Sequence, residues 1–274
     1  MMMKTIKTLL AAAAFSGLLA GAASAEGQIE SPDVSYSFEG PFGTYDRGQL
    51  QRGYKVYKEV CAACHSMNLL SFRNLAEEGG PSYSTEQIKA LAATFTVKDG
   101  PGEDGEMFDR PGRPSDRFPS PFANEQAARA SNGGALPPDL SLITKARPGW
   151  FGTVNQLVNG IGGPEYVHAV LTGYEDAPTS AGKLPDGKYY NRYFASGHFI
   201  SMPPPLTDGA LTFDDGAPNS IDAMATDVSA FLAWTAEPKM EERKSLGFMV
   251  VIYLTIFAVL MYFVKQRIWA KVEH

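Results

Sequence analysis

A stretch of 19 uncharged residues near the carboxyl end, 246–264, sets the strongest limit on how this chain can fold. A helix of this length spans roughly 28 Å at 1.5 Å per residue, close to the ~30 Å hydrocarbon core of a bilayer. A helix buried in a soluble core normally has a polar face, and this stretch offers only Thr255 and two tyrosines. Basic residues flank it on both sides, so they orient it only weakly. We therefore expect a single transmembrane anchor within 243–274.

The first 25 residues have the pattern of a secretory signal peptide. Lys4 and Lys7 precede an uncharged, alanine-rich stretch that ends in Ala23-Ser24-Ala25, which is typical of the site where such peptides are cleaved. The alternative is a retained first transmembrane helix, but the stretch is short for a span. The sequence predicts an exported body over 26–242 and a short tail on the cytoplasmic side.

The charge balance of the exported body differs from that of the whole chain. The full sequence has a formal net charge of −6, whereas residues 26–242 hold 17 basic and 29 acidic residues, a net charge of −12. This balance argues against a nucleic-acid partner, whose binding surfaces are usually basic. It favours a basic protein partner. The candidate contact patches are the acidic runs at 77–78, 103–106 and 214–215.

Apolar residues at helical spacing predict an all-α body with unusually long connections. Asp46 is placed to cap the first helix, Ser84 and Gln87 match a capping box, and Pro164 suits the first position of a helix. Residues 99–121 contain five prolines and four glycines and are expected to form a loop. The expected helices cover 50–61, 84–95, 150–159, 164–171 and 221–234.

Both cysteines of the chain lie in one pentapeptide, Cys61-Ala62-Ala63-Cys64-His65. C-x-x-C-H is the attachment signature of c-type haem. Two thiols at this spacing can each form a thioether to one haem edge, and the adjacent imidazole reaches the iron as an axial ligand. A thioredoxin-like redox pair is one alternative, but it needs no histidine and normally follows a strand. A zinc site is another, but it needs two further ligands, and the remaining histidines are scattered.

The second axial ligand must come from far along the chain to reach the opposite face of the haem. Met67 is too close to His65 to cross the ring. Met202 is followed by three prolines, whose fixed φ makes a rigid wall that suits a weak thioether ligand. His198 is the main competitor, and the local sequence leaves the two open. The positions of the other candidates suit this role less well, and these are Met107, Met224, Met240 and His168.

Several short strings in order resemble the cytochrome c1 family, the haem subunits of the ubiquinol–cytochrome c reductase (bc1 complex), in a bacterial form. They are C-A-A-C-H-S-M at 61–67, G-A-L-P-P-D-L-S at 134–141, L-T-G-Y at 171–174, M-P-P-P at 202–205, F-D-D-G at 213–216 and A-E-P at 236–238. The resemblance implies a mostly α fold, with a class I cytochrome c-like haem domain, long loop insertions and one C-terminal transmembrane helix.

The resemblance also implies a set of haem contacts. Thioethers would form at Cys61 and Cys64, and the iron ligands would be His65 and Met202. Arg147 would pair with a propionate, because guanidinium groups suit carboxylates. The remaining implied contacts are Asn132, Ala135, Pro137, Tyr166, Leu171, Phe194 and Pro205.

The implied function is one-electron transfer through one covalent haem c, from a Rieske iron–sulfur protein to a soluble basic cytochrome c. Such a chain is a redox subunit of a respiratory or photosynthetic quinol oxidation complex that translocates protons, with no catalytic chemistry of its own. The implied partners are cytochrome b, the Rieske protein and membrane lipid, in a homodimeric complex of the bacterial inner membrane. The haem domain would lie in the periplasm and the carboxyl terminus in the cytoplasm.

Two other functions share these features. A membrane-anchored cytochrome of a peroxidase or terminal oxidase is one, although peroxidases of this kind usually carry two haem motifs and an open iron. A free tethered cytochrome shuttle is the other, but shuttles usually have about 100 residues per haem. A body of 217 residues with one haem motif favours docking within a complex.

Overall fold

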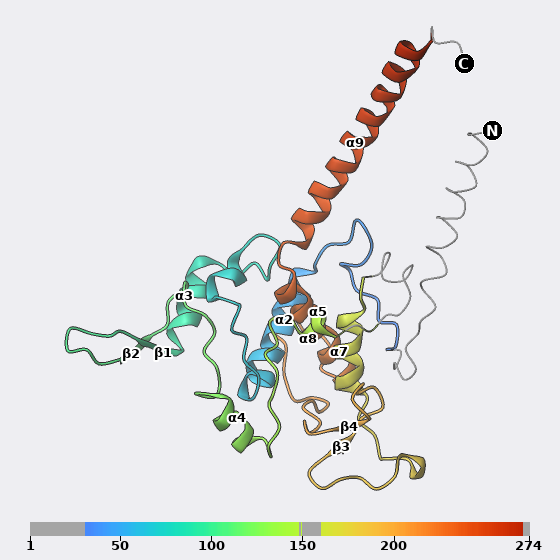
Figure 1. Ribbon diagram of the computed structural model, residues 1–274. Helices are drawn as coiled ribbons and strands as arrows, with labels where there is room; N and C mark the ends of the chain where they lie inside the picture. Colours follow the sequence, from blue (N-terminus) through green and yellow to red (C-terminus); the bar gives the residue numbers. More distant parts are fainter. Residues whose placement is uncertain (1–30, 148, 150–159, 271–274) are drawn as a thin grey trace.

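Helices account for most of the regular structure of the chain. The computed structural model describes residues 31–147, 149 and 160–270, and within them the expected mostly α fold class is confirmed (Figure 1). The predicted signal peptide and the predicted helix over 150–159 lie outside the described residues. The helices are α2 (Arg47–Glu59), α3 (Thr85–Ala93), α4 (Glu125–Ser131), α5 (Ile143–Ala146), α7 (Gly163–Thr172), α8 (Ile221–Ala236) and α9 (Met240–Trp269), and the strands are β1 (Thr96–Asp99), β2 (Phe108–Pro111), β3 (Tyr189–Tyr190) and β4 (Phe199–Ile200).

Side-chain caps set where α2 and α3 begin. The Asp46 carboxylate accepts a hydrogen bond from the Gln49 amide at 3.0 Å, so Asp46 is the N-cap of α2, as predicted. Ser84 and Gln87 form the predicted capping box of α3. Each cap satisfies amide donors that the first turn of a helix leaves without a partner.

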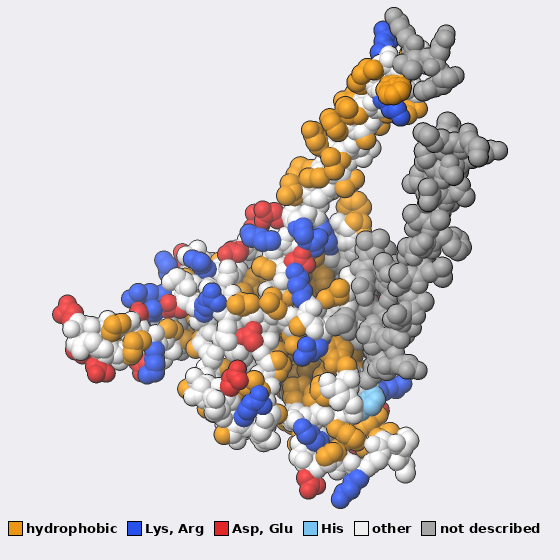
Figure 2. Space-filling model, in the orientation of Figure 1, with side chains coloured by type: hydrophobic (Ala, Val, Ile, Leu, Met, Phe, Trp, Pro, Cys, Tyr) orange, Lys and Arg blue, Asp and Glu red, His pale blue; other side chains and the backbone are white. Residues whose placement is uncertain are grey.

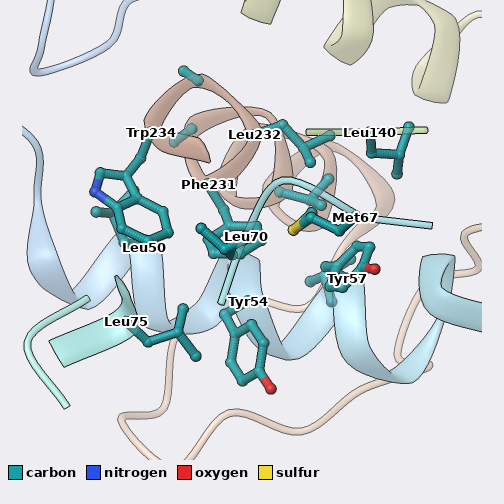
Figure 3. Packing of buried hydrophobic residues seen from close by; sticks show 14 of the residues in the cluster. Leu50, Tyr54, Tyr57, Met67, Leu70, Leu75, Leu140, Phe231, Leu232 and Trp234 are labelled. Atoms are coloured by element: carbon teal, nitrogen blue, oxygen red, sulfur yellow. The ribbon is translucent and has the colours of Figure 1, made fainter. Parts of the chain in front are cut away.

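The centre of the body is the contact between α2 and α8, seen from close by in Figure 3. Gly53 of α2 lies against the backbone of α8, where an added Cβ would be 2.1 Å from the Asp227 carbonyl oxygen. Tyr54 and Phe231 pack beside this contact, with ring centroids 5.6 Å apart. Nearly every residue over 224–236 is buried. Helix α8 is therefore covered on all sides, whereas its apolar spacing predicted one buried face.

Helix α7 packs on α8 and carries a buried carboxyl group. Pro164 lies in its first turn, as predicted. Glu165 is only 1% exposed. Burial, together with the nearby carboxylates of Glu39 and Asp33, raises the pKa of Glu165 from 4.5 to about 8. The Glu165 side chain is therefore largely protonated at neutral pH.

The proline- and glycine-rich segment is not a simple loop, and the prediction for 99–121 is wrong in part. Strands β1 and β2 pair antiparallel, with Thr96 opposite Pro111 and Asp99 opposite Phe108. The hairpin projects from the body as an arm (Figure 1). Arg110 fixes its base through ion pairs to Asp99 and Asp116. A periodic pattern of apolar residues cannot predict these ion pairs, because they depend on individual charged side chains.

Helix α9 projects from the body as an apolar stalk with basic side chains near both of its ends (Figures 1 and 2). Its most apolar stretch has a mean hydropathy of 2.4, and none of that stretch is buried. This exposure excludes a core helix of a soluble domain. The predicted span 246–264 lies inside α9, whose length and composition fit a single membrane crossing.

The first two turns of α9 are fixed to the body. Glu241 pairs with Arg47 of α2 at 2.7 Å and accepts a hydrogen bond from the Tyr45 amide at 2.8 Å. The Lys244 ammonium donates to the carbonyl oxygens of Phe38 and Gly43 at 2.7 and 3.1 Å. An ion pair and hydrogen bonds therefore hold the start of α9 against the body.

Candidate functional site

The two cysteines lie in a tight turn directly after α2. The helix ends at Glu59, two residues earlier than its apolar spacing predicted, and a 3₁₀ turn follows over 61–63. The Cys61 carbonyl oxygen accepts hydrogen bonds from the amides of Cys64 and His65 at 3.1 and 2.9 Å. This turn gathers both thiols and the imidazole into one short segment, with Cys64 exposed and Cys61 half-buried.

The environment of the thiols does not suit the two alternatives to haem attachment. Burial and the neighbouring Cys64 raise the pKa of Cys61 to about 12, and the pair follows the C-terminal end of a helix. Redox-active C-x-x-C pairs need a lowered thiol pKa, which a helix N-terminus supports. Over the described residues, no group of three or more His, Cys, Asp or Glu side chains could hold a metal ion. The zinc alternative is therefore not favoured either.

The ring of His65 is oriented by a backbone carbonyl from a distant segment. Its Nδ1 lies 2.8 Å from the Pro138 carbonyl oxygen. A carbonyl only accepts, so Nδ1 carries the proton and Nε2 keeps a free lone pair. Burial lowers the pKa of His65, which favours the neutral ring. A metal-binding histidine needs this tautomer and this kind of second hydrogen bond.

Asp139 joins the His65 segment to the segment that carries Pro138. One carboxylate oxygen accepts from the Ser66 hydroxyl and the Asn68 amide, both at 2.8 Å. The other oxygen accepts from the Ser141 amide at 2.8 Å. Because Asp139 bonds to both sides, it holds the acceptor of the His65 ring in place. Asp139 lies in a string that carried the resemblance, but its bonding role was not anticipated.

Met202 lies directly after a small hairpin that the sequence did not predict. Strands β3 and β4 pair Tyr189 with Ile200, and Met202 follows two residues after β4. The Tyr174 hydroxyl donates to the Met202 carbonyl oxygen at 3.1 Å. The L-T-G-Y string thus supplies the residue that fixes the backbone of Met202. The side chain of Met202 is half-buried.

A buried asparagine links the Met202 hairpin to the end of α7. Asn191 is fully buried, donates to the Val170 carbonyl oxygen at 2.7 Å and accepts from the Tyr193 amide at 3.0 Å. Its backbone also pairs with Tyr174. Sequence reasoning missed Asn191, because an asparagine in a turn-rich stretch gives no sign of burial. Figure 1 shows this hairpin beyond α7, at the end of the body away from α9.

The structure places the competing methionines where they have other roles. Met67 and Met224 are fully buried in the core cluster that Figure 3 shows in part, and Met240 is 5% exposed. Met107 is 56% exposed on the hairpin arm. These positions agree with the reasons for which the sequence ranked them below Met202.

The two candidate histidines also have partners. His168 is buried in α7, and its Nε2 lies 3.0 Å from an Asp222 carboxylate oxygen. His198 adopts a φ of 66° and stacks on Tyr190, with its Nδ1 3.3 Å from the Asn191 carbonyl oxygen. The contact of His168 engages its Nε2, which makes His168 the weaker candidate. His198, like His65, uses its Nδ1 and keeps its Nε2, so the choice of Met202 over His198 stays a prediction that rests on the resemblance.

The other residues implied by the resemblance fall into two groups. In the segment that leads to Pro138, Asn132 caps the end of α4 with its amide on the Ala128 carbonyl oxygen, and Ala135 and Pro137 follow it. On the α7 side, the Tyr166 hydroxyl accepts from the Ala195 amide at 3.3 Å. Half-buried positions on this side are those of Leu171, Phe194 and Pro205.

Arg147 stands apart from both groups. Its side chain is exposed and donates to the Ala146 carbonyl oxygen at 3.0 Å. No described contact assigns it a carboxylate partner, so its role toward a propionate stays a prediction.

The donor set fits a haem of the c type. Two adjacent thiols and a histidine with a free Nε2 lie in one turn, and an apolar segment lies next to them. In that segment Leu136 is 37% exposed, and the apolar core continues through the half-buried Val60, Cys61 and Ala62. On the α7 side the same core continues through the half-buried Leu171. A large apolar group with one metal would satisfy both the donors and this apolar surface.

Comparison with known proteins gives consistent matches. Residues 36–272 match the Cytochrome C1 family. "Cytochrome c1" of Cereibacter sphaeroides is 47% identical over 97% of this chain and 96% of its own length, and "Cytochrome c1" of Rhodospirillum rubrum is 42% identical over 98% of each. "Cytochrome b/c1" of Bradyrhizobium diazoefficiens is 55% identical over 97% of this chain, and the chain spans 39% of that relative's length.

Proposed function

Because the chain belongs to the cytochrome c1 family, we propose that it transfers single electrons through one covalent haem c as the redox subunit of a bc1 complex. The electron comes from a Rieske iron–sulfur protein and leaves to a soluble cytochrome c. The observation that carries this proposal is the hydrogen bond from His65 Nδ1 to the Pro138 carbonyl oxygen, because it leaves Nε2 free for iron.

The residues of this chain hold the haem and tune it. When bound, haem c supplies an iron that changes by one electron between two oxidation states. Cys61 and Cys64 would attach the ring, and His65 and Met202 would hold the iron. A His/Met pair raises the reduction potential. With both of these residues holding the iron, O₂ and peroxide would be kept from it, so the site would transfer electrons and do no oxygen chemistry.

The partners follow from the family and from charge. The name of the Bradyrhizobium relative joins cytochrome b to c1, and this chain covers 39% of its length, which supports cytochrome b as a neighbour. The net charge of −12 over 26–242 supports a basic soluble cytochrome c as the acceptor. We further propose a homodimeric complex, as is usual for this family.

The proposed location is the bacterial inner membrane, with α9 as the single anchor. The signal-peptide pattern over 1–25 supports removal of that segment and export of the haem domain to the periplasm. The carboxyl terminus then lies in the cytoplasm. Haem attachment outside the cytoplasm agrees with this orientation.

Purification from membranes in mild detergent tests the assignment to a complex. The chain is expected to copurify with a b-type cytochrome and an iron–sulfur protein, and quinol is expected to reduce its haem. Recovery of the chain without these two subunits would overturn the assignment. Stoichiometric binding of CO to the native reduced protein would favour the alternative, an open-iron peroxidase or oxidase subunit.

A further inference from the structure

The loop over 39–44, which we term the Phe42 loop, lies beside the start of α9. Phe42 is 75% exposed, more than any other large apolar side chain in the described part of the chain. A single exposed apolar side chain is ordinary on a soluble surface, but one that adjoins a large exposed apolar surface is informative. The loop belongs to the blue segment that rises next to the base of α9 in Figure 1.

The Phe42 ring packs on α9 at the level where the uncharged stretch begins. Its centroid lies 5.7 Å from that of Phe248, and the two rings meet edge to face at 74°. Phe248 is the third residue of the stretch 246–264 and is itself 53% exposed. Phe42 therefore lies at the same depth along the stalk as the first turn of the predicted span.

The Phe42 loop is held in one conformation by contacts on both sides. Lys244 donates to the carbonyl oxygens of Phe38 and Gly43. The Thr44 amide donates to the Ser37 carbonyl oxygen at 3.1 Å. The chain turns so tightly that a Cβ on Gly43 would lie 2.0 Å from the Glu39 carbonyl oxygen. The exposed position of Phe42 is therefore built into the fold and does not result from a loose loop.

The surroundings of the Phe42 loop match a membrane interface. Exposed ion pairs join Lys239 to Glu242 and Arg243 to Glu237 near the start of α9. Such long basic side chains can also reach lipid headgroups while their stems cover apolar surface. An exposed aromatic ring beside such residues suits the boundary between headgroups and acyl chains. The surface that Phe42 extends is continuous with the lipid-facing surface of α9.

We propose that the Phe42 loop is a second membrane contact, in which the Phe42 side chain inserts among lipids beside the first turn of the span. Because the loop is bonded to α9 and leads directly into α2, this contact fixes how the body is rotated over the membrane. The inference rests on the membrane anchor of the proposed function, and lipid is the occupant to which it commits.

Photocrosslinking in native membranes tests this inference. A photoreactive phenylalanine, p-benzoylphenylalanine, is placed at position 42 of the full-length chain. After irradiation the complex is purified, and the adducts are identified by mass spectrometry. We expect lipid adducts at position 42. Capture of a peptide from another subunit, or the absence of any adduct, would overturn the inference. The haem absorption spectrum of each variant confirms that it has folded.

Two further positions of the photoreactive residue serve as controls for the result at position 42. The same residue at Phe248 is expected to capture lipid, because that position lies in the span. At Phe108, which is 48% exposed on the hairpin arm, it is expected to capture none. Lipid capture at 248 but not at 42 contradicts this inference alone. Failure at 248 as well contradicts the membrane anchor, and the inference falls with it.

Discussion

The two proposed iron ligands are held in different ways. The His65 ring itself is fixed, because its Nδ1 is bonded to the Pro138 carbonyl oxygen. For Met202 the described hydrogen bond fixes only the backbone, through the Tyr174 hydroxyl. A thioether accepts weak hydrogen bonds at most, so the position of its sulfur depends on the backbone and on packing. Met202 is therefore the ligand that a single substitution is expected to remove with least damage to the fold.

Replacing Met202 with Leu should lower the midpoint potential and open the iron. Leucine keeps the apolar volume but has no sulfur to ligate the metal, and His/Met ligation raises the potential. The expected result in a spectroscopic redox titration is a lower midpoint, together with about one CO bound per reduced haem where the native protein binds none. The control is His198→Ala, which should change neither property. An unchanged midpoint in the Met202 variant together with a changed midpoint in the His198 variant would reverse the assignment.

Glu165 shows how one buried group links stability to pH. Its pKa in the folded chain, about 8, lies above its ordinary 4.5. Between these values the folded state holds a proton that the unfolded state has lost. The free energy of unfolding therefore falls as the pH rises through this window, by up to about 1.4 kcal/mol per pH unit.

Glu165→Gln should make this pH dependence shallower and stabilise the protein at pH 8. Glutamine is neutral at every pH and has nearly the same shape, so position 165 loses no proton on unfolding. Burial also raises the pKa of Glu39 and of Asp227, so part of the dependence remains. Denaturant unfolding followed by circular dichroism between pH 5.5 and 8.5 measures the slope. Glu103→Gln, on the exposed arm, should keep the native slope. A slope in Glu165→Gln equal to the native slope would show that other groups carry all of it.

At the scale of elements, the contact between α2 and α8 depends on the absence of a side chain at one position. Gly53 allows the α2 backbone to reach the Asp227 carbonyl of α8, where a Cβ would be 2.1 Å from that oxygen. Glycine within a helix costs about 1 kcal/mol relative to alanine. Close packing of the two helices offsets that cost.

Gly53→Ala should destabilise the body by about 3 kcal/mol or more, because the added methyl group forces the helices apart. Gly48→Ala on the same helix is the matched control. Its Cβ would lie 3.3 Å from the Asp46 cap oxygen and would meet no backbone atom. The cap has to shift by only a few tenths of an ångström, so the change should be far less destabilising than Gly53→Ala. Thermal or denaturant unfolding of both variants measures the difference. Equal stabilities would contradict the role assigned to the close contact.

The elements that could be predicted from the sequence are those set by near neighbours. The caps at Asp46 and Ser84 act within three residues of themselves. The hairpin arm could not be predicted, because its strands show no alternation of apolar and polar residues. Its base also depends on the ion pairs of Arg110. Burial of α8 on all sides depends on which elements pack around it, and its own spacing does not encode that.

In the candidate site, too, some residues could be assigned from the local sequence and others could not. The cysteines and His65 could be assigned from one pentapeptide, because attachment needs only their spacing. The acceptor that orients His65 lies 73 residues away, beyond the reach of a local pattern. The choice between Met202 and His198 stayed open in the local sequence. Tyr174 and Asn191 order the segment around both residues through contacts made in the folded chain, and the assignment to Met202 stays a prediction.

At the scale of the whole molecule, residues 26–242 carry an excess of acidic side chains. The net charge over 26–242 is −12, and acidic side chains stand out at the tip of the hairpin arm (Figure 2). Such a charge attracts a basic carrier over distances that dissolved salt shortens. The effect acts on the rate of encounter more than on the electron transfer itself.

Electron transfer to a basic soluble cytochrome c should therefore slow as salt is added. From about 10 mM to about 200 mM salt we expect the second-order rate to fall roughly tenfold. Stopped-flow measurement of the oxidation of the reduced chain gives this rate. An uncharged oxidant should show little dependence on salt. A flat profile with the basic cytochrome would mean that the net charge does not guide the encounter.

The contacts that hold the base of α9 to the body have a consequence for the timing of electron transfer. Because Glu241 and Lys244 are bonded to the body, we expect the proposed haem domain to keep one orientation relative to α9 and not to swing toward a distant donor. A carrier protein that exchanges electrons with the proposed haem domain must therefore move to that domain. The interval between successive electrons is then governed by how quickly those carriers arrive and depart.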